Sequence, residues 1–231
     1  MQIMHTKILK NLKTRTGAGF AILAMVLSVL GGCATEGKVK PAGISQEPSM
    51  AKGLTVTRLE DGRKGFIITE VPQMDEASRK DFERAIAMMK DQDYGQAIDI
   101  LEKIIEKSPG VTAPYIDIAI AYQHIGKLEQ AEEHLKTALN LVPDHPVASN
   151  EYGLLCRRTG RFADARAIYE KAIERFPDYY PMHRNLGILC DLYLNDPVCA
   201  LAHYEIYSEA MPEDKQVKLW IADLRARLGR N

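Results

Sequence analysis

A period of 34 residues constrains this chain more than any other feature of its sequence. Prolines recur at Pro109, Pro143 and Pro177, and a small residue lies 12 and 24 positions before each of them. A fixed period of this length is typical of stacked copies of one supersecondary unit, in which each copy buries its apolar face against its neighbours. We therefore expect a repeat array. The small residues concerned are Ala97, Ala131, Ala165, Ala85, Ala119 and Gly153.

The second copy, residues 112–145, has the pattern of two helices joined by a turn. Apolar residues at three- and four-residue steps give its first helix a buried face, Gly126 provides the turn, and Ala131 and Leu135 line the second helix. Small residues let the two helices approach closely, and the closing proline ends the second helix. This spacing resembles the tetratricopeptide repeat, a 34-residue helix-turn-helix unit with small residues at its eighth and twentieth positions. The resemblance implies an all-α fold, an α-solenoid.

The resemblance extends over about four repeats. The fourth repeat reaches its small residue, Ala200, and its proline, Pro212, one position late, so we place an extra residue in the turn at 194–197, where an insertion costs little. The apolar stripe of residues 214–228 predicts a ninth helix that caps the open end of the array. We expect this tetratricopeptide repeat domain, with its capping helix, to span residues 75–231. The first three repeats are residues 78–111, 112–145 and 146–179, and the fourth begins at residue 180.

Residues 1–32 have the pattern of a lipoprotein signal peptide. Basic residues without an acidic one precede an apolar run over residues 17–30, which is shorter than the roughly 20 residues that a spanning helix needs. The following Leu30-Gly31-Gly32-Cys33 resembles the bacterial lipoprotein box, in which the cysteine is lipidated and becomes the new N-terminus. An ordinary signal peptide that ends near a cysteine is the alternative. Ala34, where an aspartate would favour the inner membrane, implies by resemblance a lipid-anchored protein of the outer membrane that faces the periplasm.

Residues 33–74 form a separate region between the lipidated cysteine and the repeats. Lys, Gly, Pro and Ser dominate residues 34–52, which is the composition of a flexible tether. Two β-prone runs then flank Asp61-Gly62 and predict a β-hairpin over residues 54–71. Because a lone hairpin is marginal in water, it must dock on the first repeat, stay loose or pair with a partner strand, and we favour the first two. Asp75 or Ser78 is expected to cap the first repeat helix.

The family resemblance implies that the first helices of the repeats line a concave groove for protein or peptide partners. Position nine of each repeat would supply an apolar floor, with amide and arginine side chains around it. This suits a segment with hydrophobic anchors and a carboxylate or backbone carbonyls, although the apolar residues could instead pack between repeats and the arginines be merely solvated. The mapped residues are Phe82, Ile86, Ile116, Ile120, Gln123, His124, Asn150, Leu154, Arg157, Arg158, Arg184, Asn185 and Ile188.

The carboxylate clamp of the chaperone-binding members of the family is not reproduced in this chain. Asn150 and Asn185 fall near clamp positions, but position nine has no asparagine and the clamp lysines are absent. We therefore do not predict a ligand with a free C-terminal carboxylate.

The remaining cysteines raise the question of a disulfide, because an exported chain enters a compartment that permits one. Cys190 falls late in the first helix of the fourth repeat and Cys199 early in the second helix, so a bridge across the inserted turn is geometrically feasible. Buried free thiols are the alternative, since repeat cores accept them readily.

Enzymes are the main class that the sequence argues against. It has no HExxH metal pair, no phosphate-binding glycine loop and no nucleophile elbow, and we expect neither a cofactor nor a metal. Nucleic acid is also disfavoured. The chain has 30 basic and 31 acidic residues, and four of the basic residues lie in the signal, which leaves the rest at a net charge of about −5.

The predicted function is that of a non-catalytic protein-protein interaction scaffold, anchored by lipid in the bacterial envelope. The architecture resembles tetratricopeptide lipoproteins that recruit partners for the assembly of envelope, pilus or secretion machinery. Other hypotheses of function remain open at this point. The protein could be an accessory component of an envelope-spanning energy-transduction or transport complex, a regulator of peptidoglycan enzymes, or a self-associating structural protein.

Overall fold

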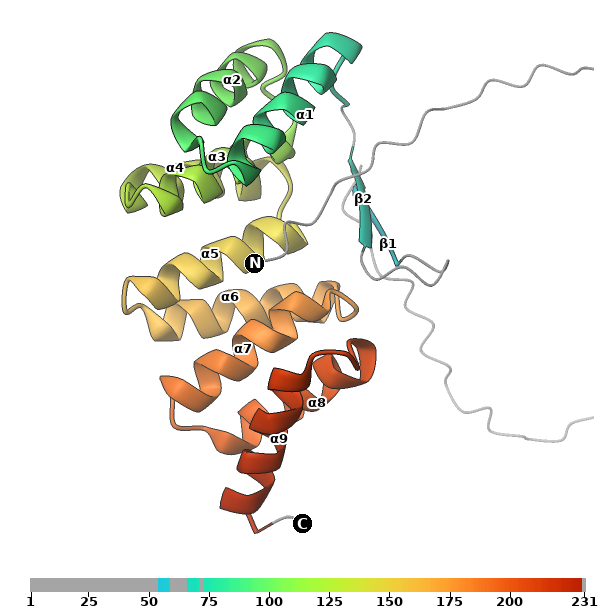
Figure 1. Cartoon of the computed structure of the whole chain (residues 1–231), viewed down its shortest axis with the longest axis vertical. Coiled ribbons are helices and arrows are strands. Elements are labelled where there is room, and N and C mark those ends of the chain that lie inside the picture. The colour runs from blue at the N-terminus through green and yellow to red at the C-terminus, as the bar shows by residue number, and fades with distance from the viewer. Residues whose placement is uncertain (1–53, 59–65, 71–72, 230–231) are drawn as a thin grey trace, which may run out of the picture. The chain divides into compact units, whose positions relative to one another are not determined.

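The computed structural model describes residues 54–58, 66–70 and 73–229. These residues contain two strands and nine helices, which confirms the all-α repeat array with a small hairpin before it. The helices pack as successive pairs, α1 on α2 through α7 on α8, and α9 packs on α8 (Figure 1). The helices are α1 Glu76–Lys90, α2 Tyr94–Lys107, α3 Thr112–His124, α4 Leu128–Leu141, α5 Pro146–Arg158, α6 Phe162–Arg175, α7 Tyr180–Leu192, α8 Pro197–Ala210 and α9 Lys215–Arg227.

The prolines and glycines of the repeats lie at helix ends and turns, as the sequence predicts. Helices α2, α4, α6 and α8 each end two residues before the proline that closes their repeat, because a residue before proline is disfavoured in the helical conformation. The turns after α3 and α5 place Gly126 and Gly160 at φ values of 78° and 77°, a region that suits glycine because it has no Cβ. At the start of α1, Asp75 is the capping residue, since its Oδ1 accepts the backbone N–H of Ser78 at 2.7 Å.

The irregular fourth repeat is accommodated in its turn, as expected. Asn195 adopts a φ of 51° between the end of α7 and the start of α8. A disulfide joins Cys190 to Cys199 across this turn, with the two Cα atoms 5.9 Å apart. In the chain-entropy model, closing a loop of this size stabilises a fold by about 2–3 kcal/mol. Cys156 is a free, buried cysteine, and burial raises the pKa of its thiol to about 11.

The core is divided among neighbouring repeats rather than gathered in one place. One buried cluster belongs to α1, α2 and α3, a second to α3, α4 and α5, and the largest runs from α5 to α9. This is the nearest-neighbour packing of a solenoid. The predicted capping helix α9 closes the array, because Val217, Ile221 and Leu224 are buried in the last cluster.

Two glycines allow a close approach between the two helices of their repeats. A Cβ placed on Gly153 of α5 would lie 2.5 Å from the ring of Tyr169 on α6, and a Cβ on Gly187 of α7 would lie 2.5 Å from the ring of Tyr204 on α8. Both tyrosines are almost completely buried. The third and fourth repeats therefore combine a glycine at the eighth position with a tyrosine facing it.

The predicted hairpin is present, and it docks on the repeats. Strands β1 (Leu54–Arg58) and β2 (Phe66–Glu70) pair antiparallel, with Leu54 opposite Glu70, while the expected Asp61-Gly62 turn lies outside the described residues. Docking on the first repeat was one expected arrangement. The contacts instead involve the second repeat, through Glu70, and the cluster of α5 to α9, through Ile68.

Glu70 provides a helix cap across a sequence distance of more than 40 residues. Helix α3 has no side-chain cap of its own. The Oε1 atom of Glu70 accepts the backbone N–H groups of Thr112 at 3.1 Å and Ala113 at 3.2 Å, and its Oε2 atom accepts the Thr112 hydroxyl. A carboxylate at this place satisfies two otherwise unpaired donors and complements the helix dipole. Burial nevertheless raises the pKa of Glu70, against the lowering effect of these hydrogen bonds.

The predicted signal peptide of residues 1–32, Cys33 and the tether of residues 34–52 lie outside the described residues. Within the part of the chain that the structure describes, none of the helices combines the length and the apolar character needed to cross a membrane.

Adding one methyl group at Gly153 tests the close approach of α5 and α6. We expect Gly153→Ala to lower the free energy of unfolding by about 1–3 kcal/mol, because the Tyr169 ring must move out of a filled core. This loss outweighs the helix-propensity gain of at most about 1 kcal/mol. Urea unfolding followed by circular dichroism measures the difference.

Gly95→Ala is the matched control for this experiment. Gly95 is an exposed glycine in α2, and a Cβ there would meet nothing within 4 Å. This substitution should leave stability unchanged or raise it by up to about 1 kcal/mol. Equal stability of the two variants would disprove the packing role assigned to Gly153.

Candidate partner-binding face

The candidate site lies on the first helices of the repeats, α1, α3, α5 and α7, which contact one another in order along the array. We define the inner face as positions five, six, nine, twelve and thirteen of these helices. Position nine is apolar throughout, and all four of its residues are partly buried and partly accessible. They are Ile86, Ile120, Leu154 and Ile188. Three of them, Ile86, Ile120 and Ile188, pack against the core clusters.

The fifth position contributes differently along the array. Phe82 and Ile116, which the sequence mapping put among the groove residues, are only 7% and 4% exposed and belong to the core clusters of the first two repeats. They therefore support the helices rather than offer a binding surface. From the third repeat onward the fifth position is polar, beginning with Asn150, which is itself only 6% exposed.

Asn150 and Asn185 meet in a hydrogen-bonded chain on this face. The Nδ2 atom of Asn185 donates to Oδ1 of Asn150 at 2.8 Å, and Nδ2 of Asn150 donates to Oε1 of Glu151 at 3.2 Å. The hydroxyl of the buried Tyr169 also reaches the backbone oxygen of Asn150, at 3.5 Å. The chain of hydrogen bonds links α5 to α7 and fixes the direction of both amides.

Arg158 and Gln123 form a second link, between α5 and α3. The Nη1 and Nη2 atoms of Arg158 each lie 3.3 Å from the backbone oxygen of Gln123, and Nη1 also donates to its Oε1 at 3.4 Å. Gln123 is 5% exposed, and its Nε2 atom has no hydrogen-bond partner in the described residues. His124 stacks on Tyr94 with ring centroids 4.6 Å apart, and partial burial, then the charge of Arg158, lower its pKa.

Among the carboxylates of this face that the sequence mapping left out, two neighbours have raised pKa values. Asp117 and Glu151 occupy the sixth position of the second and third repeats, the position that Asn185 holds in the fourth, so the repeat register was the signal that could have found them. Burial, followed by the negative charge of Glu151, raises the pKa of Asp117 to about 7. Burial also raises the pKa of Glu151, against the lowering effect of the hydrogen bond from the Asn150 amide.

The arginines of the inner face have unequal roles. Arg184 is already engaged with the capping helix, because its Nε atom lies 3.6 Å from Oδ2 of Asp214 and its guanidinium lies 5.3 Å from the ring centroid of Trp220. Arg157 instead lies over the ring of Tyr193, at 5.8 Å from its centroid. Arg184 is therefore a structural contact of the cap, whereas the partly buried Arg157 lines a pocket.

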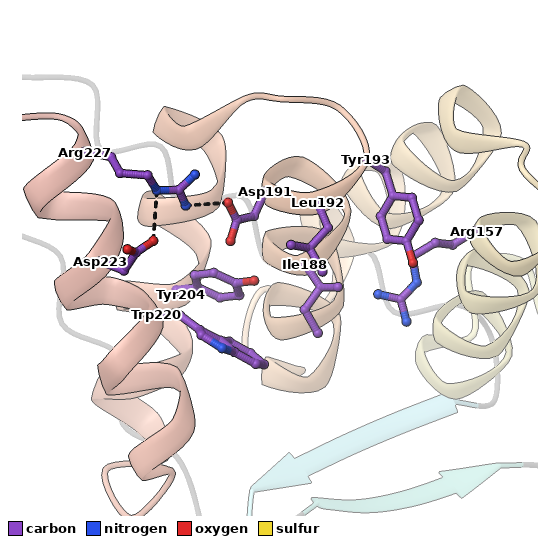
Figure 2. Close-up of a pocket in the computed structure, with 9 residues that line it drawn as sticks. All are labelled: Arg157, Ile188, Asp191, Leu192, Tyr193, Tyr204, Trp220, Asp223 and Arg227. Carbon is purple, nitrogen blue, oxygen red and sulfur yellow. Dashed lines mark hydrogen bonds and ion pairs between the residues drawn. The ribbon is translucent and has the colours of Figure 1, made fainter.

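A pocket of about 740 Å³ opens at the C-terminal end of the inner face. Figure 2 shows residues of α5, α7, α8 and α9 converging on it, with Ile188 and Leu192 between Arg157 on one side and the ion pairs of Arg227 on the other. Its volume is in the range of small-molecule and side-chain binding sites. The lining residues are Arg157, Ile188, Asp191, Leu192, Tyr193, Tyr204, Trp220, Asp223 and Arg227.

The clusters of potentially reactive groups have structural explanations. Among the described residues, Cys190, Asp196 and Cys199 form a group of three potential metal ligands, but both sulfurs belong to the disulfide and Asp196 caps α8 through the N–H of Cys199 at 3.0 Å. His183 and His203 lie with their Nδ1 atoms 3.0 Å apart between α7 and α8. Burial, then the charge of His183, lowers the pKa of His203 to about 4.

The raised pKa of Asp117 makes the stability of the domain depend on pH. Its ionisation costs the folded state free energy as the pH rises from about 4 to about 7, and the cost is complete above pH 7. Asp117→Asn is therefore expected to stabilise the domain at pH 8, by about 1–2 kcal/mol after allowance for screening at a half-buried site, and to have little effect at pH 4.

Urea unfolding at pH 8 and at pH 4 measures this difference. Asp99→Asn, on the exposed surface of α2, is the matched control and should have the same small effect at both values. If Asp117→Asn changed stability equally at pH 4 and pH 8, its carboxylate would not be under strain in the folded state.

Comparison with known proteins identifies the repeats. Residues 111–178 match a tetratricopeptide repeat family model, and residues 81–110 match a second model of the same description. The human protein O-mannosyl-transferase TMTC2 is 34% identical over 87 residues, which are 36% of this chain and 10% of that protein. The chain spans between 10% and 28% of the length of the first curated relatives that it matches.

Solved structures share the arrangement of helices over a larger part of the chain. The structure described as PilW, a widely conserved type IV pilus biogenesis factor, has a TM-score of 0.59 and 26% identity, covering 68% of this chain and 72% of that one. The Pseudomonas aeruginosa pilF structure has a TM-score of 0.62 at 22% identity, covering 66% and 69%, and this likeness shows the fold alone. The helices of this chain therefore form a helix-turn-helix array with the tetratricopeptide repeat fold.

Proposed function

We propose that this chain is a non-catalytic scaffold, anchored by lipid in the bacterial outer membrane and facing the periplasm, that recruits protein partners for the assembly of pilus machinery. The observation that carries the proposal is the inner face of the repeats. It combines accessible apolar residues at position nine with polar side chains whose directions are fixed by hydrogen bonds between α3, α5 and α7. The likeness to a pilus biogenesis factor at 26% identity supports the pathway.

A face of this kind suits protein binding for a thermodynamic reason. Association costs free energy for every side chain that must be immobilised, and side chains that are already held lose little further freedom. The amide of the partly exposed Asn185 is held by Asn150, which is itself buried and bonded to Glu151. The ordering cost then falls on the partner segment alone, and no chemical step is needed.

The lipid anchor is supported by the sequence alone. Leu30-Gly31-Gly32-Cys33 follows an apolar run of the length of a signal peptide. Acyl chains on Cys33 would hold the protein at a membrane surface, because each buried methylene contributes about 0.8 kcal/mol and more than one chain gives stable anchoring. The residues between Cys33 and the first strand would give the repeat domain reach from that surface.

Site-specific photocrosslinking in the cell tests the binding face. A photoreactive phenylalanine derivative at Leu154, an inner-face position in α5, is expected to capture a small, reproducible set of envelope proteins, pilus assembly components among them. The same derivative at Glu174, an exposed position of α6 on a second helix of a repeat, should capture few or none. Mass spectrometry of the adducts identifies the partners.

Several outcomes of the crosslinking experiment would contradict the proposal. Identical adducts from Leu154 and Glu174 would mean that the inner face is not the binding site. Specific adducts without any pilus component would agree with a scaffold role but contradict a role in pilus assembly. The absence of specific adducts from Leu154 in cells that assemble pili would remove both.

Two substitutions near the lipoprotein box test the anchor. Cys33→Ser should abolish labelling by an alkyne analogue of palmitate and remove the protein from the outer-membrane fraction of a density gradient. Ala34→Asp should keep the label but shift the protein toward the inner-membrane fraction. Continued labelling of Cys33→Ser would show that acylation occurs elsewhere or that the signal has been misassigned.

A further inference from the structure

The pocket at the C-terminal end of the inner face has an apolar wall that its own chain leaves uncovered. Leu192, the last residue of α7, is 69% exposed, and the neighbouring Tyr193 is 46% exposed. On the α9 side of the pocket, the ring of Trp220 packs on Tyr204, with centroids 5.2 Å apart. Exposed leucine and tyrosine side chains beside a preformed hollow are what an apolar anchor residue of a partner would bury.

The charges of the pocket are separated between its two ends. At one end Arg227 lies 2.7 Å from Asp191 and 2.9 Å from Asp223, so one guanidinium is shared by two carboxylates and that end keeps a net negative charge. At the other end, among the described residues, Arg157 has no carboxylate within ion-pair distance. Figure 2 shows these groups on opposite sides of Ile188 and Leu192.

Arg157 is also held in a direction that suits an incoming group. Its guanidinium lies 5.8 Å from the ring centroid of Tyr193, a cation–π contact that leaves the edge of the guanidinium free to donate. A planar guanidinium binds a carboxylate through two parallel hydrogen bonds, with better geometry than a neutral acceptor allows. The pocket therefore provides an anion site directly beside an apolar site.

We infer that this pocket binds a short segment of a partner protein in which an apolar side chain stands next to an aspartate or glutamate. The apolar side chain packs on Leu192 and Tyr193, and the carboxylate pairs with Arg157. The inference rests on the proposed function and specifies the chemistry of the partner at one end of the inner face.

The negative end of the pocket fixes the direction of the bound segment. Asp223 is 66% exposed at its side chain, so it repels a second acidic residue on that side of the apolar anchor and accepts a basic one. Complementary charges at two ends of a site select orientation and partner more than they add affinity. A segment with acidic residues on both sides of its anchor should bind less well than one with an acidic and a basic neighbour.

Selection from a random heptapeptide display library on the full mature protein, purified in detergent with its lipid, tests the inference. Peptides enriched on the wild-type protein should carry Asp or Glu beside Leu, Ile, Phe or Tyr. Fluorescence anisotropy with one enriched peptide should then give a Kd that rises roughly tenfold for Arg157→Glu, because a charge-assisted contact becomes a repulsion. Leu192→Ser should weaken the same peptide without changing its preference for an acidic residue.

Lys103→Glu, an equal change of charge on the exposed side of α2, is the matched control and should leave the Kd unchanged. Thermal unfolding of each variant shows whether the fold is intact. The inference is wrong if the enriched peptides lack acidic residues, if no peptide is enriched, or if Arg157→Glu binds as well as Lys103→Glu. If crosslinking at Leu154 still captured partners in the cell, the proposed function would hold although this inference failed. If both the peptide selection and the crosslinking failed, the proposed function would be wrong as well.

Discussion

The close approach of the two helices within each repeat is the constraint on which the rest of the structure depends. In the third and fourth repeats it depends on Gly153 and Gly187, which leave room for the rings of Tyr169 and Tyr204. Each ring fills the space that a side chain on the facing helix would take. A buried tyrosine also places its polar end at the edge of the core, and the hydroxyl of Tyr169 reaches the backbone of Asn150 there. Helix packing and inner-face geometry are thus coupled through single side chains.

The same coupling extends to the C-terminal end of the array. Tyr204 fills the space over Gly187 and packs against the ring of Trp220 in the capping helix. Trp220 in turn lies under the guanidinium of Arg184, which is close to Asp214 at the start of α9. The cap therefore does more than cover apolar surface. It supplies one wall of the pocket and positions Asp223 and Arg227 on it.

Local and periodic features of the fold could be predicted from the sequence, and long-range pairings could not. The prolines, the turn glycines and the late proline of the fourth repeat act within a few residues, so their spacing was sufficient to place the helix ends. Glu70 capping α3 could not be foreseen, because the cap comes from a strand more than 40 residues away. The sequence predicts which positions of each repeat form the inner face. Which of its residues are buried, as Phe82 is, depends on neighbouring helices that one repeat pattern does not describe.

The carboxylates of the inner face lower the stability of the folded state, although the helices could form without them. Asp117 and Glu151 lie on one surface with their pKa values raised, so each ionised carboxylate makes the folded state less stable than a neutral side chain would. Groups whose ionisation is disfavoured in this way concentrate at functional sites, where a partner supplies the missing interaction. Arg157 is the opposite case, a cation set against an aromatic ring beside exposed apolar residues. A face with strained carboxylates in its middle and an accessible arginine at its end has an electrostatic direction. This face would therefore recognise a partner segment by the order of its charges as well as by its apolar anchor residues.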